Sequence, residues 1–186
     1  RALIVALILA ITIASLMAVL GERIERTLLR QGSAILGADL VLSSSRAIDQ
    51  SAITAATQAG LLSSEVIQLG TMANSGDNFL LVTVRALNAP YPRGEINLSP
   101  HKEQPIPNIG EAWAEQSTLD RLHLDLGDNI TLGNTSFKLT GVIQSAPDRG
   151  RGFISFNPQL IINRAQLTAT GLLGPGARAS YRQLFA

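Results

Sequence analysis

The pattern of apolar and polar residues changes abruptly near Gly21. Residues 2–21 read ALIVALILAITIASLMAVLG, without a charged side chain and with hydroxyl groups only at Thr12 and Ser15. A helix rises about 1.5 Å per residue, so this segment spans roughly 30 Å, the thickness of the hydrocarbon core of a bilayer. It has no polar face to turn toward water. The pattern therefore predicts a transmembrane helix over residues 1–21.

Two other interpretations of this segment stay open. A secretory signal peptide has an apolar region of about 7–15 residues that ends in a small-x-small cleavage site. Here the apolar run is longer, and its end at residues 17–21 lacks a clean site of that kind. A buried core helix would need a domain large enough to surround it. The chain begins at Arg1 without an initiator Met, which suggests a fragment of a longer protein.

The next segment, residues 22–37, is predicted to be a helical stalk. Ile24, Leu28 and Ile35 keep a rough helical spacing, and arginines alternate with them along the same stretch. These arginines could lie near lipid headgroups or form an ordinary solvated helix face. Gly37 is expected to end the stalk.

The following pattern predicts a strand, a helix, a strand and a strand, the usual opening of a split α+β domain. Asp49 is expected to cap the helix and Gly60 to end it. The turn at residues 74–78 should join the last two strands into a hairpin. The four elements are expected at residues 39–42, 49–60, 65–72 and 79–87.

Residues 88–110 contain five of the eight prolines and are expected to be an extended passage between two lobes. Beyond them the pattern predicts a short helix at 117–122, with Ser117 as its cap, and closely spaced strands at 111–114, 130–132, 136–144 and the first part of 159–170. A last strand is expected at 180–186. The predicted division is 38–89 for the first part of an α+β lobe, 90–176 for an inserted β-rich lobe, and 177–186 for the truncated return strand.

Composition and motifs narrow the function classes. The net charge of +1 argues against a nucleic-acid-binding footprint. The absence of cysteine excludes thiol catalysis, thiolate metal sites and disulfides. No phosphate-binding loop motif is present, so the chain is not expected to bind or hydrolyse ATP by itself. We predict no catalytic residue, no cofactor and no metal site, and therefore no enzyme.

Two weaker candidates remain. His123 with Asp120 and Asp125 would make a catalytic group, although a solvated helix end explains these residues more simply. Residues 150–152, Gly-Arg-Gly, might bind an anion, although an ordinary hairpin loop is the simpler interpretation.

Three phrases carry a family resemblance: ERTLLRQGSAILGADLVLSSSRAI directly after the apolar segment, GEAWAEQSTLDRLHLDLGDNITLGNTSFKLTGVI, and PDRGRGFISFNPQLIINRAQLTATGLLGPGARASYRQLF. Together they resemble MacB/FtsX-type ABC transporter permeases of the YbbP-like subgroup. The resemblance implies a first transmembrane helix followed by a two-lobed MacB-like periplasmic domain, in the bacterial inner membrane. It also implies a separate cytoplasmic ABC ATPase as partner, and a periplasmic partner or lipid-like substrate.

The leading hypothesis is a permease subunit of an ABC-type export or mechanotransmission system, whose periplasmic domain transmits ATP-driven motion across the inner membrane. The alternative is a membrane-anchored extracytoplasmic hydrolase or ligand-binding domain. An adhesion or assembly module is a third hypothesis.

Overall fold

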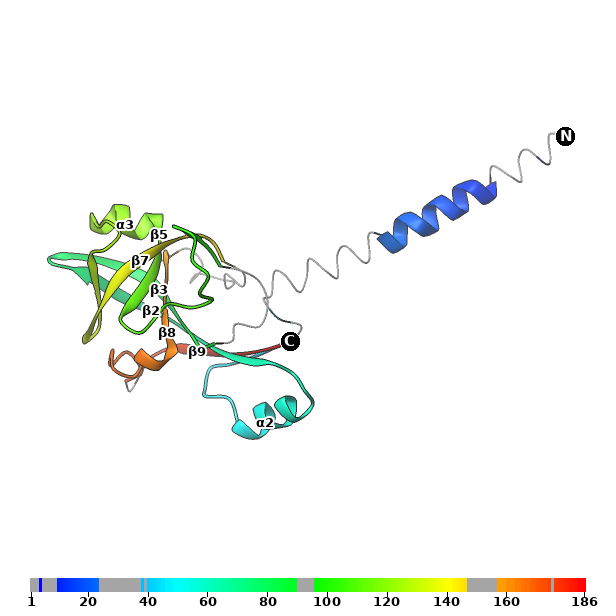
Figure 1. Cartoon of the computed structure of the whole chain (residues 1–186). Coiled ribbons are helices and arrows are strands. Elements are labelled where there is room, and N and C mark those ends of the chain that lie inside the picture. Colours follow the sequence, from blue (N-terminus) through cyan, green and yellow to red (C-terminus); the bar gives the residue numbers. More distant parts are fainter. Residues whose placement is uncertain are drawn as a thin grey trace.

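The computed structural model describes residues 4, 10–23, 38, 40–89, 96–146, 157–174 and 176–186. Residues 10–23 are helical and exposed, and Figure 1 shows this helix apart from the sheet domain. Apolar side chains such as Leu16 and Met17 are about two-thirds exposed on it. None of the helices within these described ranges combines the length and hydropathy needed to cross a membrane. Much of the predicted span, and the predicted stalk after Arg23, lie outside the described residues.

The described part of the chain beyond this helix has an α+β fold with one nine-stranded sheet. Along the sheet the order is β1-β9-β2-β3-β8-β5-β7-β4, and β6 pairs with both β2 and β7. The helices are α2 (Gln50–Gln58), α3 (Gln116–Leu122) and the 3-10 helix η2 (Arg164–Gln166). The strands are β1 (Leu40–Ser44), β2 (Ser63–Ser75), β3 (Asn78–Leu87), β4 (Asn97–Ser99), β5 (Glu111–Glu115), β6 (Asn129–Leu132), β7 (Thr135–Ser145), β8 (Gln159–Asn163) and β9 (Ala179–Phe185).

Strand β2 connects two parts of this sheet. One of its edges pairs with β3 over ten positions, from Val66 to Ser75. Its other edge is shared, because Ser63–Leu69 pair with β9 and Ala73–Asn74 pair with β6. The β6 pairing closes the described strands β2, β3, β8, β5, β7 and β6 into a ring. Strands β9 and β1 continue the sheet outward from β2, beyond the ring.

The alternation of side chains along the strands separates two cores. Ring residues such as Ile67, Val84 and Phe137 form the larger core, and α3 packs Leu119 and Leu122 against it. The smaller core lies on the opposite side of the strands and contains Trp113 with, among others, Ile143, Ile161 and Leu184. Trp113 fits there because Gly141, on the neighbouring strand β7, has no Cβ; a Cβ would stand 3.0 Å from the indole Cδ1.

Most local signals in the sequence correspond to the observed elements. Asp49 caps α2, since its side chain accepts a hydrogen bond from the backbone N–H of Ser51. Strands β2 and β3 form the expected antiparallel hairpin. The expected cap at Ser117 is wrong: α3 begins one residue earlier, and Glu115 is its N-cap residue, without a side-chain cap hydrogen bond. Strand β4 was not expected from the pattern.

The predicted lobes contribute strands to one continuous sheet. Strand β8, from the segment predicted as an inserted lobe, pairs in parallel with β3 from the first segment. Strand β9, from the segment predicted as a return strand, pairs with β1 and β2. The division of the chain into two lobes stays a prediction.

The two hairpin glycines offer a matched test of packing. Gly76 and Gly133 have the same backbone φ of +55°, but a Cβ at Gly76 meets open space, whereas one at Gly133 would overlap the carbonyl oxygen of Thr170. That oxygen also accepts a hydrogen bond from the backbone N–H of Asn134. The turn between β6 and β7 therefore lies directly against the segment that follows η2.

We expect Gly133→Ala to destabilise the protein more than Gly76→Ala. Both variants carry the left-handed backbone cost of about 1–2 kcal/mol, and Gly133→Ala adds an overpacking cost of about 1–3 kcal/mol. The difference corresponds to a melting temperature lower by roughly 2–10 °C in a chain of this size. Thermal unfolding followed by the fluorescence of Trp113, the single tryptophan, measures it. Equal melting temperatures would contradict the contact.

Candidate functional site

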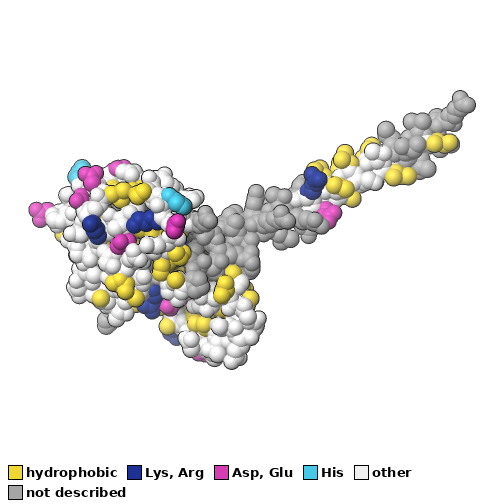
Figure 2. Space-filling view, in the orientation of Figure 1, with side chains coloured by type: hydrophobic (Ala, Val, Ile, Leu, Met, Phe, Trp, Pro, Cys, Tyr) yellow, Lys and Arg dark blue, Asp and Glu magenta, His cyan; other side chains and the backbone are white. Residues whose placement is uncertain are grey.

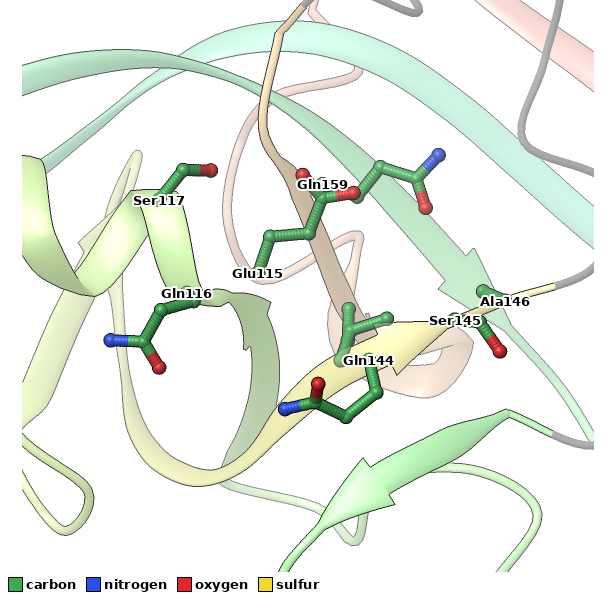
Figure 3. Close-up of a pocket in the computed structure, with 8 residues that line it drawn as sticks. Glu115, Gln116, Ser117, Gln144, Ser145, Ala146 and Gln159 are labelled. Atoms are coloured by element: carbon green, nitrogen blue, oxygen red, sulfur yellow. The ribbon is translucent and has the colours of Figure 1, made fainter.

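A pocket of about 320 Å³ lies where β5 and β7 end and β8 begins (Figure 3). Strands β5 and β7 are parallel neighbours, so their carboxyl ends meet at one edge of the sheet. The lining is mainly polar, with carboxylate, amide and hydroxyl side chains. Its apolar residues, Ile143 and Ala146, belong to the smaller core or pack against it. The lining residues are Glu115, Gln116, Ser117, Ile143, Gln144, Ser145, Ala146 and Gln159.

Two of the lining side chains come from adjacent strands. Strand β5 pairs with β8 in an antiparallel register that sets Ala114 against Leu160. One step further along this register Glu115 stands opposite Gln159, on the same face. Gln159 is 2% exposed, and its Oε1 has no hydrogen-bond partner among the described residues. A buried amide oxygen without a donor is an uncommon and unfavourable arrangement.

A second hollow, of about 410 Å³, lies beside the loop after β4. Its lining includes His101 and Lys102, and the Lys102 Nζ lies 3.6 Å from the Glu111 carboxylate. The hydroxyl of Thr140 donates to the same carboxylate at 3.1 Å. Partial burial of Glu111 acts to raise its pKa, but the hydrogen bond from Thr140 and the charge of Lys102 outweigh it, so the pKa lies below its ordinary value.

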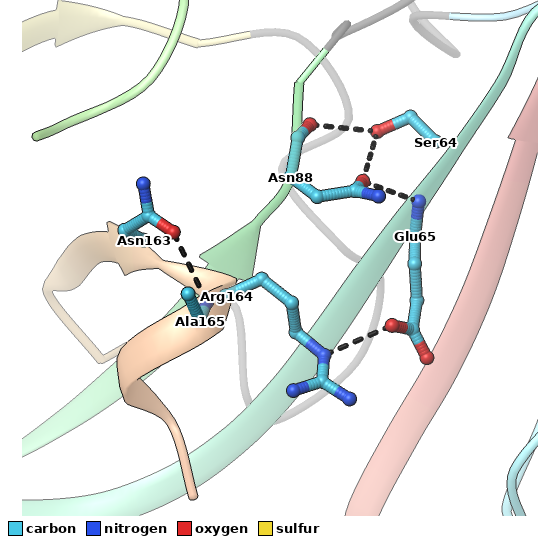
Figure 4. Close-up of polar contacts among 6 residues, drawn as sticks. All are labelled: Ser64, Glu65, Asn88, Asn163, Arg164 and Ala165. Carbon is cyan, nitrogen blue, oxygen red and sulfur yellow. Dashed lines mark hydrogen bonds and ion pairs between the residues drawn. The ribbon is translucent and has the colours of Figure 1, made fainter. Parts of the chain in front are cut away.

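A polar network joins the start of β2 to η2 (Figure 4). The Asn88 side chain accepts hydrogen bonds from the hydroxyl of Ser64 and from the backbone N–H of Glu65. The Glu65 carboxylate in turn accepts from the Nε of Arg164 at 2.9 Å. These contacts fix the end of β3 and the start of η2 to β2. The side chains of this network bond to one another, and the network lines neither of the two pockets.

The structure does not join His123, Asp120 and Asp125 into a catalytic group. His123 ends α3 in a left-handed conformation, with a φ of 53°, and is exposed. Asp120 accepts from Gln116, and Asp128, not His123, bonds to the backbone N–H of Asp125. Within the described ranges, no group of three or more acidic, His or Cys residues is placed to hold a metal ion. The Gly-Arg-Gly candidate at 150–152 lies outside the described residues.

Sequence reasoning missed the pocket. Glu115 and Gln159 are far apart in the sequence, and only the pairing of β5 with β8 brings them together. A local signal existed for each, since Gln159 is a polar residue directly before three apolar residues of β8 and Glu115 directly follows the buried residues Ala112–Ala114. On the face seen in Figure 2, acidic and basic side chains are interspersed over the sheet domain.

No protein-family model matches the chain. Over 98% of its length it is 29% identical to an uncharacterized ABC transporter permease, YbbP, of Escherichia coli (strain K12). The chain is similar to an ABC transporter permease. This match confirms the resemblance to MacB/FtsX-type, YbbP-like permeases that the three sequence phrases indicated.

The permease-like chain spans 23% of the length of YbbP. Among solved structures, it is similar to the extracellular domain of the noncanonic ABC-type transporter YknZ from Gram-positive bacteria. That similarity has a TM-score of 0.39 and 11% sequence identity, and it covers 64% of each chain. A similarity of this size does not establish a common fold.

We expect Thr140→Val to raise the pKa of Glu111 toward its ordinary value near 4.5, because the hydroxyl donor to the carboxylate is lost. A depressed folded-state pKa gives stability that is present above the unfolded pKa and is lost as the pH falls through the folded value. The variant should therefore be less stable at neutral pH and lose less stability on acidification. NMR titration of the Glu111 carboxyl measures its pKa. Melting curves at neutral and at acidic pH measure the change in stability.

The control is Thr131→Val on the neighbouring strand β6, because the Thr131 hydroxyl makes no hydrogen bond within the described residues. This variant should leave the titration of Glu111 unchanged. An unchanged Glu111 pKa in Thr140→Val would mean that the hydroxyl does not set the ionisation of this carboxylate.

Proposed function

We propose that this chain is part of the permease subunit of an ABC-type export or mechanotransmission system. In this proposal residues 1–21 form a membrane helix, residues 22–37 a stalk, and the sheet domain lies in the periplasm of a bacterial cell. A separate cytoplasmic ATPase hydrolyses ATP, and the sheet domain transmits the resulting motion. The domain acts as two lobes, with residues 90–176 inserted into the lobe that residues 38–89 and 177–186 form.

The observation that carries the proposal is the sequence similarity to an ABC transporter permease over 98% of the chain. A coupling role needs no catalytic group in this chain, because hydrolysis takes place in another subunit. The catalytic hypothesis has less support, since His123 and the two nearby aspartates have separate surroundings.

The geometry of the sheet supports a coupling role. Strand β1 follows the N-terminal helix and stalk in the chain, and its first residue, Leu40, pairs with Phe185 at the end of β9. The first strand of the sheet domain and β9, near the other end of the described residues, thus lie side by side. Force on β1 reaches β9 through five residue pairs, and β9 passes it to β2 through seven more. Strand β2 is also part of the ring.

The proposal predicts that a flexible insertion between the helix and β1 uncouples the domain. In the full-length permease with its ATPase, a six-residue Gly-Ser insertion after Arg23 should leave ATP hydrolysis and the Trp113 fluorescence unchanged. It should abolish the ATP-dependent change in hydrogen exchange of the β1–β9 amides that we expect in the unmodified protein. A flexible linker cannot carry the displacement, because it behaves as a random coil.

The matched control places the same insertion between Gly76 and Asp77, in the turn of the β2–β3 hairpin, away from the proposed path of force. This variant should keep the ATP-dependent change. The proposal fails if ATP changes no amide exchange in the sheet domain of the unmodified complex.

The cysteine-free sequence allows a direct test of orientation. Asp77→Cys places a thiol on an exposed turn, and we expect a membrane-impermeant maleimide to label it in spheroplasts before lysis. Ala114→Cys is the control, because Ala114 is 0% exposed and should be labelled only after unfolding. Labelling of Asp77→Cys only after lysis would place the sheet domain in the cytoplasm.

A further inference from the structure

We propose that residues 164–173 form a lid on one end of the ring, and that the ion pair between Glu65 and Arg164 is the latch that holds this lid closed. The lid consists of η2 and the turns that follow it. The inference concerns the conformational stability of the sheet domain itself. It therefore goes beyond the proposed coupling role and does not depend on it.

The lid lies at the end of the ring opposite α3. Strands β5 and β8 are antiparallel, α3 directly follows β5, and η2 directly follows β8. Figure 1 accordingly shows α3 and the orange segment after β8 on opposite sides of the ring. Leu167 is fully buried in the larger core, and Leu172 and Leu173 pack against that core. The lid thus covers the larger core at one end, as α3 does at the other.

Backbone groups from two distant parts of the chain donate hydrogen bonds to the lid. The N–H of Gly110, before β5, donates to the Oε1 of Gln166 at 2.7 Å. The N–H of Asn134, in the turn between β6 and β7, donates to the carbonyl oxygen of Thr170 at 2.9 Å. Both bonds exist only while the lid is docked. Each therefore stabilises the docked state and, by linkage, favours every other contact of the lid.

The latch joins the lid to β2 across the end of β3. Glu65, Asn88 and Arg164 stand in one row at the ends of β2, β3 and β8. The Asn88 side chain accepts from the backbone N–H of Glu65, and the Arg164 Nε donates to the Glu65 carboxylate at 2.9 Å (Figure 4). The two charged side chains are 30% and 31% exposed. Salt weakens an ion pair in such a position, whereas it leaves neutral hydrogen bonds largely unchanged.

The latch lies where β9 joins β2, because Glu65 pairs with Gln183 of β9. A displacement of β9 and β2 relative to β8 would therefore act directly on the contact between Glu65 and Arg164. This consequence alone rests on the proposed coupling role.

Amide hydrogen exchange of the full chain in detergent micelles, followed by NMR without ATP, tests the lid. The amides of Gly110 and Asn134 donate to the lid, so their exchange rates report its opening. Glu65→Gln keeps the shape of the side chain and removes its charge. We expect this variant to speed the exchange of both amides by roughly 2- to 5-fold, the effect of losing a half-exposed ion pair.

A control amide and a control variant show whether the effect is confined to the lid. The amide of Gly127 donates to the carbonyl oxygen of Leu139, outside the lid, and should keep its rate in Glu65→Gln. Asp120→Asn removes a charge from α3, at the other end of the ring, and should change the exchange of neither lid amide.

Two further measurements test whether the ion pair itself is the latch. Arg164→Gln and the double variant with Glu65→Gln should give the same rates as Glu65→Gln alone, because all three lose the same contact. At about 1 M salt the Debye length is about 3 Å. This salt concentration should speed the exchange of Gly110 and Asn134 in the unmodified chain and have no further effect in Glu65→Gln.

Gln166→Met tests whether the lid opens as one unit. It removes the acceptor of the Gly110 amide but touches neither the Asn134 bond nor the latch. We expect it to speed the exchange of Asn134 as well. A change confined to Gly110 would overturn the inference, and so would unchanged rates in Glu65→Gln or equal salt responses of the two chains. None of these readouts involves ATP, so their failure is distinct from a failure of the proposed coupling role.

Discussion

The two-sided pairing of β2 is the interaction on which the rest of the structure depends. This strand gives one edge to β3 and divides the other between β9 and β6. Without the short contact of Ala73 and Asn74 with β6, the ring would be open and the larger core exposed on one side. Without β9, the first strand β1 would have no sheet to join. One strand therefore holds together the enclosed core and the edge that follows the N-terminal helix.

The proposed coupling role would rest on this arrangement of strands. A continuous ladder of backbone hydrogen bonds resists stretching because the bonds between strands share a load. The polar network of Asn88, Glu65 and Arg164 adds a second connection between β2, β3 and η2. Displacement at β1 would therefore move the whole sheet domain instead of deforming its edge. Rigidity of this kind is what a coupling element requires.

The pocket beside β5 and β7 occupies a different place in the same framework. It lies on the side of the smaller core, at the ends of β5 and β7 and beside the start of α3. Beside it, the buried Oε1 of Gln159 has no hydrogen-bond donor among the described residues, an arrangement that costs roughly 1–3 kcal/mol.

The sequence by itself determined the local elements and the family resemblance. Alternation placed the β2–β3 hairpin, glycine and asparagine marked the turns at Gly76 and Gly133, and Asp49 marked the start of α2. These signals are local, because a turn or a cap depends on residues within a few positions. Only the tertiary structure decided that β8 lies between β3 and β5, that β6 closes the ring, and that Glu115 meets Gln159. Such pairings depend on which buried faces fit together across long loops, and the period of a single strand does not specify its neighbour.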